Sequence, residues 1–141
     1  MRLCVPIPCF FKNVDFCDAI KTVKDLGYDA IETYNWKNLD QNAVKKTLDE
    51  TGVEFVSMCT TEFRLTDPQY RELWLAGLKE SCEAAERMGV KRLITQVGPD
   101  TGAPRADQHQ AIVEIFQKKM KMHHSSSFSK RSFMYSFCTL E

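Results

Sequence analysis

Glycine is scarce in this 141-residue sequence, and its absence from one segment excludes two nucleotide-binding folds. The stretch PIPCFFKNVD, which follows the first apolar run, contains none of the six glycines. P-loop and dinucleotide-binding folds place a glycine-rich turn at this point, because the backbone must approach the phosphates closely. We therefore expect no nucleotide to bind after the first strand.

Paired metal-binding cysteines are also missing. None of the six cysteines forms a CxxC pair, and the three histidines lie far from any two neighbouring cysteines, so a zinc site is not expected. Cys17, Cys59 and Cys82 fall within apolar patterns, which predicts buried free thiols in a cytosolic protein. His109 is expected to be a packed or surface residue of a helix and not a metal ligand.

No apolar run approaches the roughly 18 residues that a membrane helix requires. Two prolines interrupt the start, MRLCVPIPCFF, so neither a membrane span nor a signal peptide is predicted, and a cytoplasmic location is expected.

The net charge is zero but unevenly divided. Residues 1–116 hold 14 Lys/Arg and 18 Asp/Glu, whereas residues 117–141 hold five Lys/Arg and one Glu. The acidic body argues against a nucleic-acid surface there.

A repeated unit runs along the first part of the chain. Three segments, VKDLGYDAIETYN, LDETGVEFVSMCT and AERMGVKRLITQV, each end a helical pattern, place a glycine and begin a short apolar run. A glycine just after a helix adopts the left-handed conformation that a Cβ disfavours. Strands are predicted at residues 2–6, 30–34, 55–59 and 92–97. The order βαβαβαβα predicts an α/β fold with a parallel sheet, and the pattern stops at Phe116.

Apolar side chains at helical spacing predict the faces that pack on this sheet. The third helix has a clear start, with Asp67 as N-cap and Pro68 at the first helical position. The residues expected to point inward, helix by helix, are Phe16, Ile20, Val23 and Leu26; Ala43, Val44 and Leu48; Tyr70, Trp74, Leu78, Cys82, Ala85 and Met88; and Ile112, Val113 and Phe116. These residues fit two architectures, a small doubly wound sheet or the first half of a (β/α)8 barrel, which needs about 250 residues in full.

The segments GYDAIETYNW, GVEFVSMCTTEF and AERMGVKRLITQVG, followed by QVGPDTGAP and ADQHQAIVEIF, resemble the xylose isomerase-like barrels. Within that group the chain is most similar to hydroxypyruvate isomerase-like proteins, over residues 1 to 116. The resemblance implies a parallel (βα)4 half of a TIM (β/α)8 barrel. It also implies an isomerase that acts on a small hydroxy-carbonyl compound or sugar with a divalent metal such as Mg²⁺ or Mn²⁺.

In that family the metal ligands and the two acid/base glutamates lie on strands five to eight, so no catalytic or metal-binding residue is assigned here. Residues 117–141 stand where the fifth strand is expected, and they read as an unrelated, basic, Ser-rich tail that is irregular or disordered. A reading-frame change or an early end in the gene explains such a switch. We therefore expect a truncated chain that is inactive alone and that self-associates through open sheet edges.

Two other functions compete with this interpretation. A small α/β binding module could hold nucleic acid with its basic tail, in which Phe and Tyr alternate with Lys and Arg. The adjacent His123 and His124 lack the partners of a metal site. The endonuclease branch of the same fold has metal-binding histidines after strands two and three, and the stretches ETYNWKNL and SMCTTEFRL contain none. Nucleic acid is therefore not the expected partner.

Barrel active sites lie at the carboxyl ends of the strands and in the loops that follow. The residues at these positions are Phe10, Glu32, Trp36, Glu62 and Gln96, together with Pro8, Tyr34, Thr61 and Gly98. Glu32 lies within an apolar strand and either orients pocket groups or pairs with a neighbouring strand. Trp36 and Phe10 line the pocket or pack at its rim. Glu62 is a solvated or substrate-facing carboxylate, and Gln96 bonds a substrate hydroxyl or caps its strand.

Overall fold

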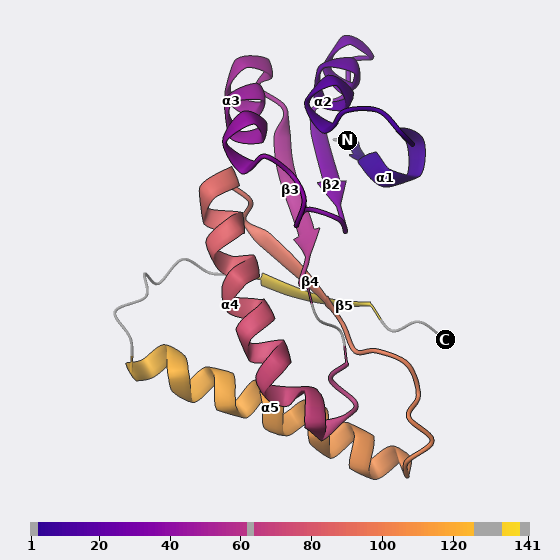
Figure 1. The fold of residues 1–141 in the computed structure, drawn as a ribbon, viewed down its shortest axis with the longest axis vertical. Coiled ribbons are helices and arrows are strands. Elements are labelled where there is room, and N and C mark those ends of the chain that lie inside the picture. The colour runs from indigo at the N-terminus through magenta and orange to yellow at the C-terminus, as the bar shows by residue number, and fades with distance from the viewer. Residues whose placement is uncertain (1–2, 62–63, 126–133, 139–141) are drawn as a thin grey trace.

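The computed structural model describes residues 3–61, 64–125 and 134–138 (Figure 1). Its elements are β1 (Cys4–Pro6), α1 (Ile7–Phe10), α2 (Phe16–Asp25), β2 (Ala30–Thr33), α3 (Gln41–Thr51), β3 (Glu54–Cys59), the 3-10 turn η1 (Pro68–Tyr70), α4 (Arg71–Met88), β4 (Arg92–Gln96), α5 (Arg105–Ser125) and β5 (Met134–Cys138). All strand pairs are parallel, in the order β1-β2-β3-β4-β5. The predicted α/β fold, a parallel half of a TIM barrel, is confirmed.

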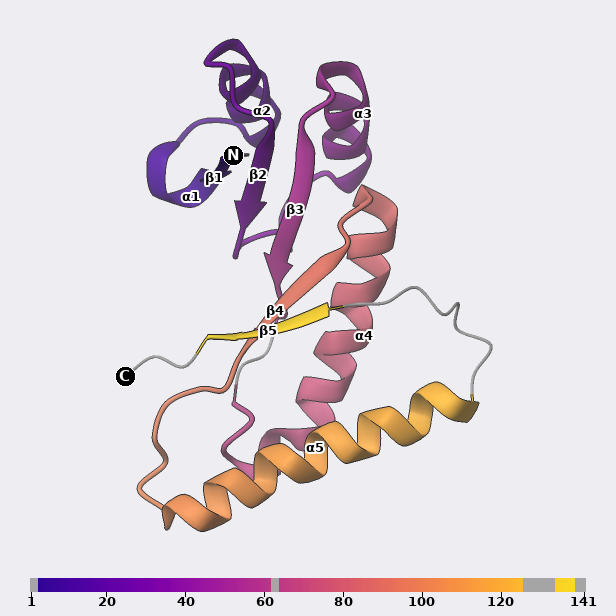
Figure 2. The ribbon, with the colours of Figure 1, turned by 180° about the vertical axis from the view of Figure 1, so that it is seen from behind.

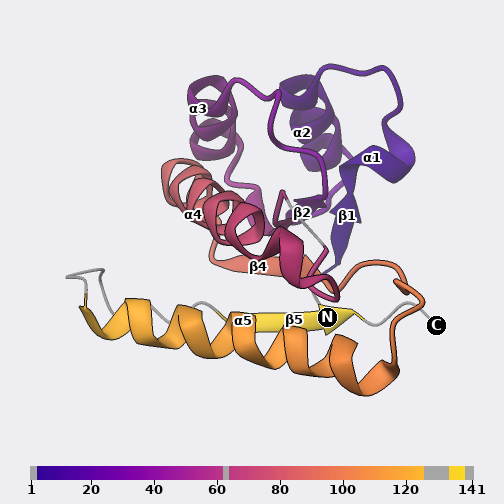
Figure 3. The same cartoon turned by 60° about the horizontal axis from the view of Figure 1, so that its bottom comes forward.

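Helices α2, α3 and α4 follow one another along the sheet, and each packs against its neighbour (Figures 1 and 3). The core lies between these helices and the strands. Its fully buried side chains include Ile20, Val23, Val44, Trp74 and Met88 from helices and Ile31, Met58 and Leu93 from strands. Burial of such apolar surface, at about 25 cal/mol per Å², is the main stabilising contribution to this fold.

The predicted helix ends are confirmed by the backbone. Gly52 and Gly89 cap α3 and α4 with φ angles of 70° and 77°, the left-handed conformation expected after a helix. Asp67 accepts a hydrogen bond from the backbone N–H of Gln69, as an N-cap does. The turn that Asp67 caps is the 3-10 turn η1, however, and helix α4 itself begins at Arg71.

Two residues that were expected to face inward are exposed. Leu26 is 64% exposed, because α2 ends one residue earlier and Leu26 stands at its C-cap. Val113 is 46% exposed, because Ala111 and Ile115 face the core, and Val113 lies two residues, or about 200°, from each around the helix. Both sequence predictions were wrong.

Regular structure also continues beyond Phe116. Helix α5 extends to Ser125, and β5 pairs in parallel with β4, with Arg92 opposite Met134 and Gln96 opposite Cys138 (Figure 2). The expected end of the βα pattern at Phe116 is thereby corrected. The division of the chain into a domain of residues 1–116 and an unrelated tail of residues 117–141 stays a prediction.

Among the described residues, no helix combines the length and apolar character needed to cross a membrane.

Candidate functional site

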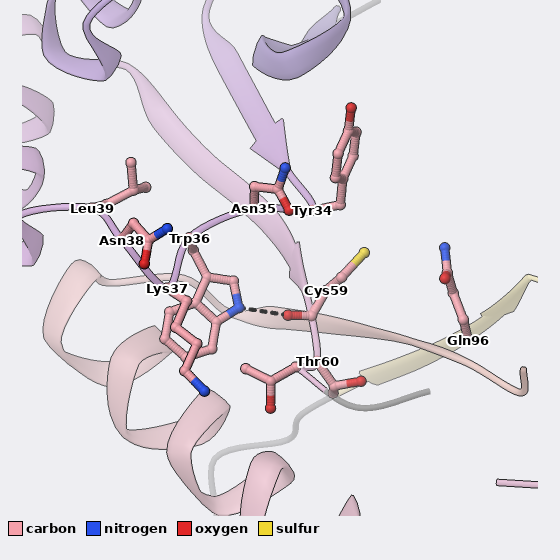
Figure 4. A pocket seen from close by; sticks show the side chains of 10 residues that line it. Tyr34, Asn35, Trp36, Lys37, Asn38, Leu39, Cys59, Thr60 and Gln96 are labelled. Carbon is pink, nitrogen blue, oxygen red and sulfur yellow. Dashed lines mark hydrogen bonds between the residues drawn. The ribbon is translucent and has the colours of Figure 1, made fainter. Parts of the chain in front are cut away.

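A pocket of about 560 Å³ opens at the carboxyl ends of β2, β3 and β4 (Figure 4). Its residues come from the loop after β2 and from the ends of β3 and β4: Tyr34, Asn35, Trp36, Lys37, Asn38, Leu39, Cys59, Thr60, Thr61 and Gln96. Parallel strands point their carboxyl ends to the same edge of a sheet, which is why segments from three βα units meet here. This is the position at which barrel enzymes place their active sites.

Trp36 forms the inner wall of the pocket and ties two of its segments together. The residue is only 3% exposed, and its indole Nε1 donates a 2.7 Å hydrogen bond to the carbonyl oxygen of Cys59 (Figure 4). The carbonyl of Trp36 in turn accepts a bond from the backbone N–H of Leu39, at 3.1 Å. A buried indole N–H needs such a partner, so Trp36 holds the loop after β2 against the end of β3.

A buried hydroxyl network supports the floor of the pocket. The hydroxyls of Thr60 and Thr95 share a hydrogen bond of 3.0 Å, and the indole Nε1 of Trp74 donates to Thr95 Oγ1 at 3.2 Å. Beside them, Ser81 Oγ accepts from the backbone N–H of Thr61 at 3.2 Å. These bonds anchor the ends of β3 and β4 to α4 and satisfy polar groups that burial would otherwise penalise.

The loop after β2 presents two amide side chains at the pocket. Thr33 Oγ1 accepts from the backbone N–H of Asn35 at 3.2 Å, within a turn that precedes Trp36. Asn35, Asn38 and, at the end of β4, Gln96 are exposed and line the pocket. Each amide offers both donors and an acceptor, which suits a ligand with several hydroxyl and carbonyl groups.

A second hollow of about 400 Å³ lies beside the first, between α1, α2 and α3. Apolar residues form much of its lining, Phe11 and Leu39 among them, and Pro8 lines it as well. Asn35, Asn38 and Leu39 belong to both hollows, so the loop after β2 forms the partition between them.

The structure brings together four of the residues that the sequence indicated: Trp36 and Gln96, with Tyr34 and Thr61. Phe10 is 72% exposed on the short helix α1 and lines neither hollow. Glu62 lies outside the described residues.

Glu32 lies below the pocket, within the sheet. It is half-buried, and its Oε2 accepts a 3.1 Å hydrogen bond from Ser57 Oγ on the next strand. The pairing of β2 with β3 shifts between Ile31 and Glu32, and this irregularity sets Glu32 opposite Ser57.

Partial desolvation, with the nearby carboxylates of Glu32 and Glu54, raises the pKa of the Cys4 thiol to about 11.

Sequence reasoning missed six residues that line the pocket: Asn35, Lys37, Asn38, Leu39, Cys59 and Thr60. Four of them follow the strand ends directly or lie within five residues of β2, so the rule that sites gather at strand ends covers them. The stretch YNWKNL carried this signal in its two asparagines.

Among the described residues, no three His, Cys, Asp or Glu side chains lie together in a way that could hold a metal ion. His109 is exposed on α5, as a surface residue would be. The side chains of His123 and His124 lie outside the described set.

A comparison with protein families decides where the chain belongs. The family model for the xylose isomerase-like TIM barrel matches residues 20–122. The chain belongs to the xylose isomerase-like TIM barrel family. This match begins within α2 and ends within α5, and most of it lies in residues 1–116, where the sequence resemblance was found. No sequence among the curated proteins matches significantly.

Solved structures share this barrel fold. The chain is similar to AP endonuclease, family 2 from Brucella melitensis, with a TM-score of 0.80 and 12% identity over 97% of this chain and 55% of that one. For 3-keto-D-glucoside 4-epimerase from E. coli the TM-score is 0.69 at 13% identity, covering 97% and 56%. The IolI protein, solved with a bound zinc atom, gives 0.72 and 11%, covering 97% and 51%. The chain thus spans about half the length of these barrel proteins.

Proposed function

We propose that this chain forms one wall of the substrate site of a sugar isomerase or epimerase of the hydroxypyruvate isomerase-like type. The observation that carries the proposal is the pocket at the carboxyl ends of β2, β3 and β4, lined mainly by amides, hydroxyls and aromatic rings. Such a lining fits a small hydroxy-carbonyl compound or sugar. The family match and the epimerase among the solved relatives support the same class of substrate.

The described residues bind and orient the substrate in this proposal. Gln96 and Asn38 donate to and accept from its hydroxyl and carbonyl groups, and Trp36 holds the loop that carries Asn38 against the end of β3. Moving a proton between adjacent carbons requires a base, an acid and a group that stabilises the intermediate charge. The described residues supply no metal cluster, and we assign them no proton-transfer step. We expect the divalent metal and the acid/base pair to come from further strands.

Binding tests the proposal most directly. Saturation-transfer NMR with hydroxypyruvate and simple ketoses should show contact with the protein, and Asn38→Ala should weaken it. The matched control is Asn42→Ala, an exposed asparagine on α3 that does not line this pocket. Equal losses in both variants, or no contact with any of these compounds, would overturn the assignment.

Turnover is a separate expectation. The purified 141-residue chain should show no isomerase activity with Mg²⁺ or Mn²⁺, because its described part lacks a metal cluster. Clear metal-dependent conversion of hydroxypyruvate by this chain would contradict that expectation.

A further inference from the structure

We propose that the pocket selects anionic hydroxy-carbonyl compounds, with the ammonium group of Lys37 as the group that binds the carboxylate or phosphate. This inference rests on the proposed function and names its substrate class. Among the described residues that line the pocket, Lys37 alone carries a charge. The described lining therefore offers an anion one cation and no carboxylate, and the carboxylate that pairs with this cation, that of Glu80 on α4, lies outside the lining.

The ammonium of Lys37 is available for exchange. It lies 3.4 Å from Glu80 Oε2 on α4, and the two side chains are 65% and 43% exposed. Ion pairs this exposed are weak, because water and salt screen both charges. A ligand anion can therefore share or replace Glu80 as the partner of Lys37 at little cost.

The arrangement of the lining gives the ligand a direction. In Figure 4 the ammonium of Lys37 and the amide of Gln96 lie at opposite sides of the pocket-lining side chains, and Thr60 and Cys59 lie between them. We assign the anionic end of the ligand to Lys37 and its hydroxyl and carbonyl groups to the polar side chains toward Gln96. This polarity distinguishes a hydroxy acid or a sugar phosphate from a neutral sugar of the same length.

Matched probes test the charge requirement. Hydroxypyruvate and dihydroxyacetone share a three-carbon skeleton and differ in a carboxylate against a hydroxymethyl group, and dihydroxyacetone phosphate adds a phosphate. Titrations followed by NMR should show tighter binding of both anions than of dihydroxyacetone, by about fivefold at low salt, which is the scale of one exposed charge pair. The two anions compared with each other show which anionic group the site prefers.

Two substitutions should move the affinity in opposite directions. Lys37→Met should remove the preference for anions, so that both anions bind no more tightly than dihydroxyacetone. Glu80→Gln should strengthen anion binding, because it releases the ammonium. The matched control is the exposed pair Lys46–Glu50 on α3, joined at 3.8 Å outside this pocket. Lys46→Met and Glu50→Gln should leave every affinity as it is, and circular dichroism checks that all four variants fold.

The outcomes separate this inference from the function on which it rests. If dihydroxyacetone binds as tightly as hydroxypyruvate, or if Lys37→Met and Lys46→Met act alike, selection of anions by Lys37 is overturned and the proposed sugar site stands. If none of the three compounds binds, both are overturned. A preference for anions that falls with added salt and disappears in Lys37→Met supports the inference.

Discussion

The indole Nε1 of Trp36 donates to the carbonyl oxygen of Cys59 across 23 residues of sequence, at 2.7 Å. This bond joins the loop after β2 to the last residue of β3, and both segments line the pocket. Trp36, an aromatic residue that could have contacted the substrate, is thus buried in the wall of the pocket. The ring contributes shape and rigidity to the site, and the exposed amides around it remain to contact a ligand.

Replacing Trp36 with Phe should lower the free energy of unfolding by about 1–3 kcal/mol, because the Cys59 carbonyl loses its buried donor and the ring loses volume. Urea denaturation measures the change. Phe10→Ala is the comparison, since Phe10 is 72% exposed and should cost less than about 0.5 kcal/mol. Similar losses of unfolding free energy in the two variants would show that Trp36 does not stabilise the fold in this way.

Thr95→Val should destabilise the fold more than its small change in shape suggests. The substitution removes an acceptor for Trp74 Nε1 and a partner for Thr60 Oγ1 in a buried site, at an expected cost of about 2–4 kcal/mol. Thr22→Val is the matched control, because Thr22 is exposed and its hydroxyl bonds a helix carbonyl. The prediction fails if urea denaturation gives the same midpoint for both variants.

Asp100 should contribute to acid sensitivity. The backbone N–H of Gly102, at 2.9 Å, and then the side-chain amide of Gln108, at 2.7 Å, hold the pKa of Asp100 below its ordinary value of 3.8. A carboxyl whose pKa is lower in the folded state stabilises that state above the unfolded pKa. This stabilisation is present above pH 3.8 and is lost as the pH falls through the folded pKa.

Gln108→Ala should raise the pKa of Asp100 part of the way back, because the bond from Gly102 remains. A carbon-detected NMR titration of the Asp100 carboxyl measures the shift directly. An unchanged pKa in this variant would assign the effect to Gly102 and the charge of Arg105.

Cys4 should stay a protonated thiol at neutral pH, since its pKa is about 11. Its alkylation by iodoacetamide, followed by peptide mass spectrometry, should accelerate only in strongly alkaline solution. Glu32→Gln should lower the pKa slightly, because it removes one nearby negative charge but not the larger desolvation. Rapid alkylation of Cys4 at pH 7 would contradict the assignment.

Self-association through sheet edges remains a prediction. Within the described residues, β1 and β5 lie at the two edges of the sheet, and each pairs with a single strand (Figure 2). Unpaired edges favour pairing with another chain, so the sedimentation coefficient should rise with protein concentration. A monomer over the whole micromolar range would contradict it.

The rival function, nucleic-acid binding by residues 117–141, is tested by deletion. Salt-dependent binding to single-stranded DNA that disappears on removing these residues would favour it. The isomerase proposal expects no such binding from the chain before or after the deletion.

The sequence by itself determined the local elements of this protein. Glycines after helices, an aspartate before a proline and apolar spacing predicted α3, α4 and the first four strands, because these signals act between neighbouring residues. Only the tertiary structure decided which strand-end side chains meet. Trp36 turned inward to Cys59, Phe10 was carried outward on α1, and a shift in register set Glu32 beside Ser57. Such outcomes depend on partners more than twenty residues away, whose register and orientation no local pattern specifies.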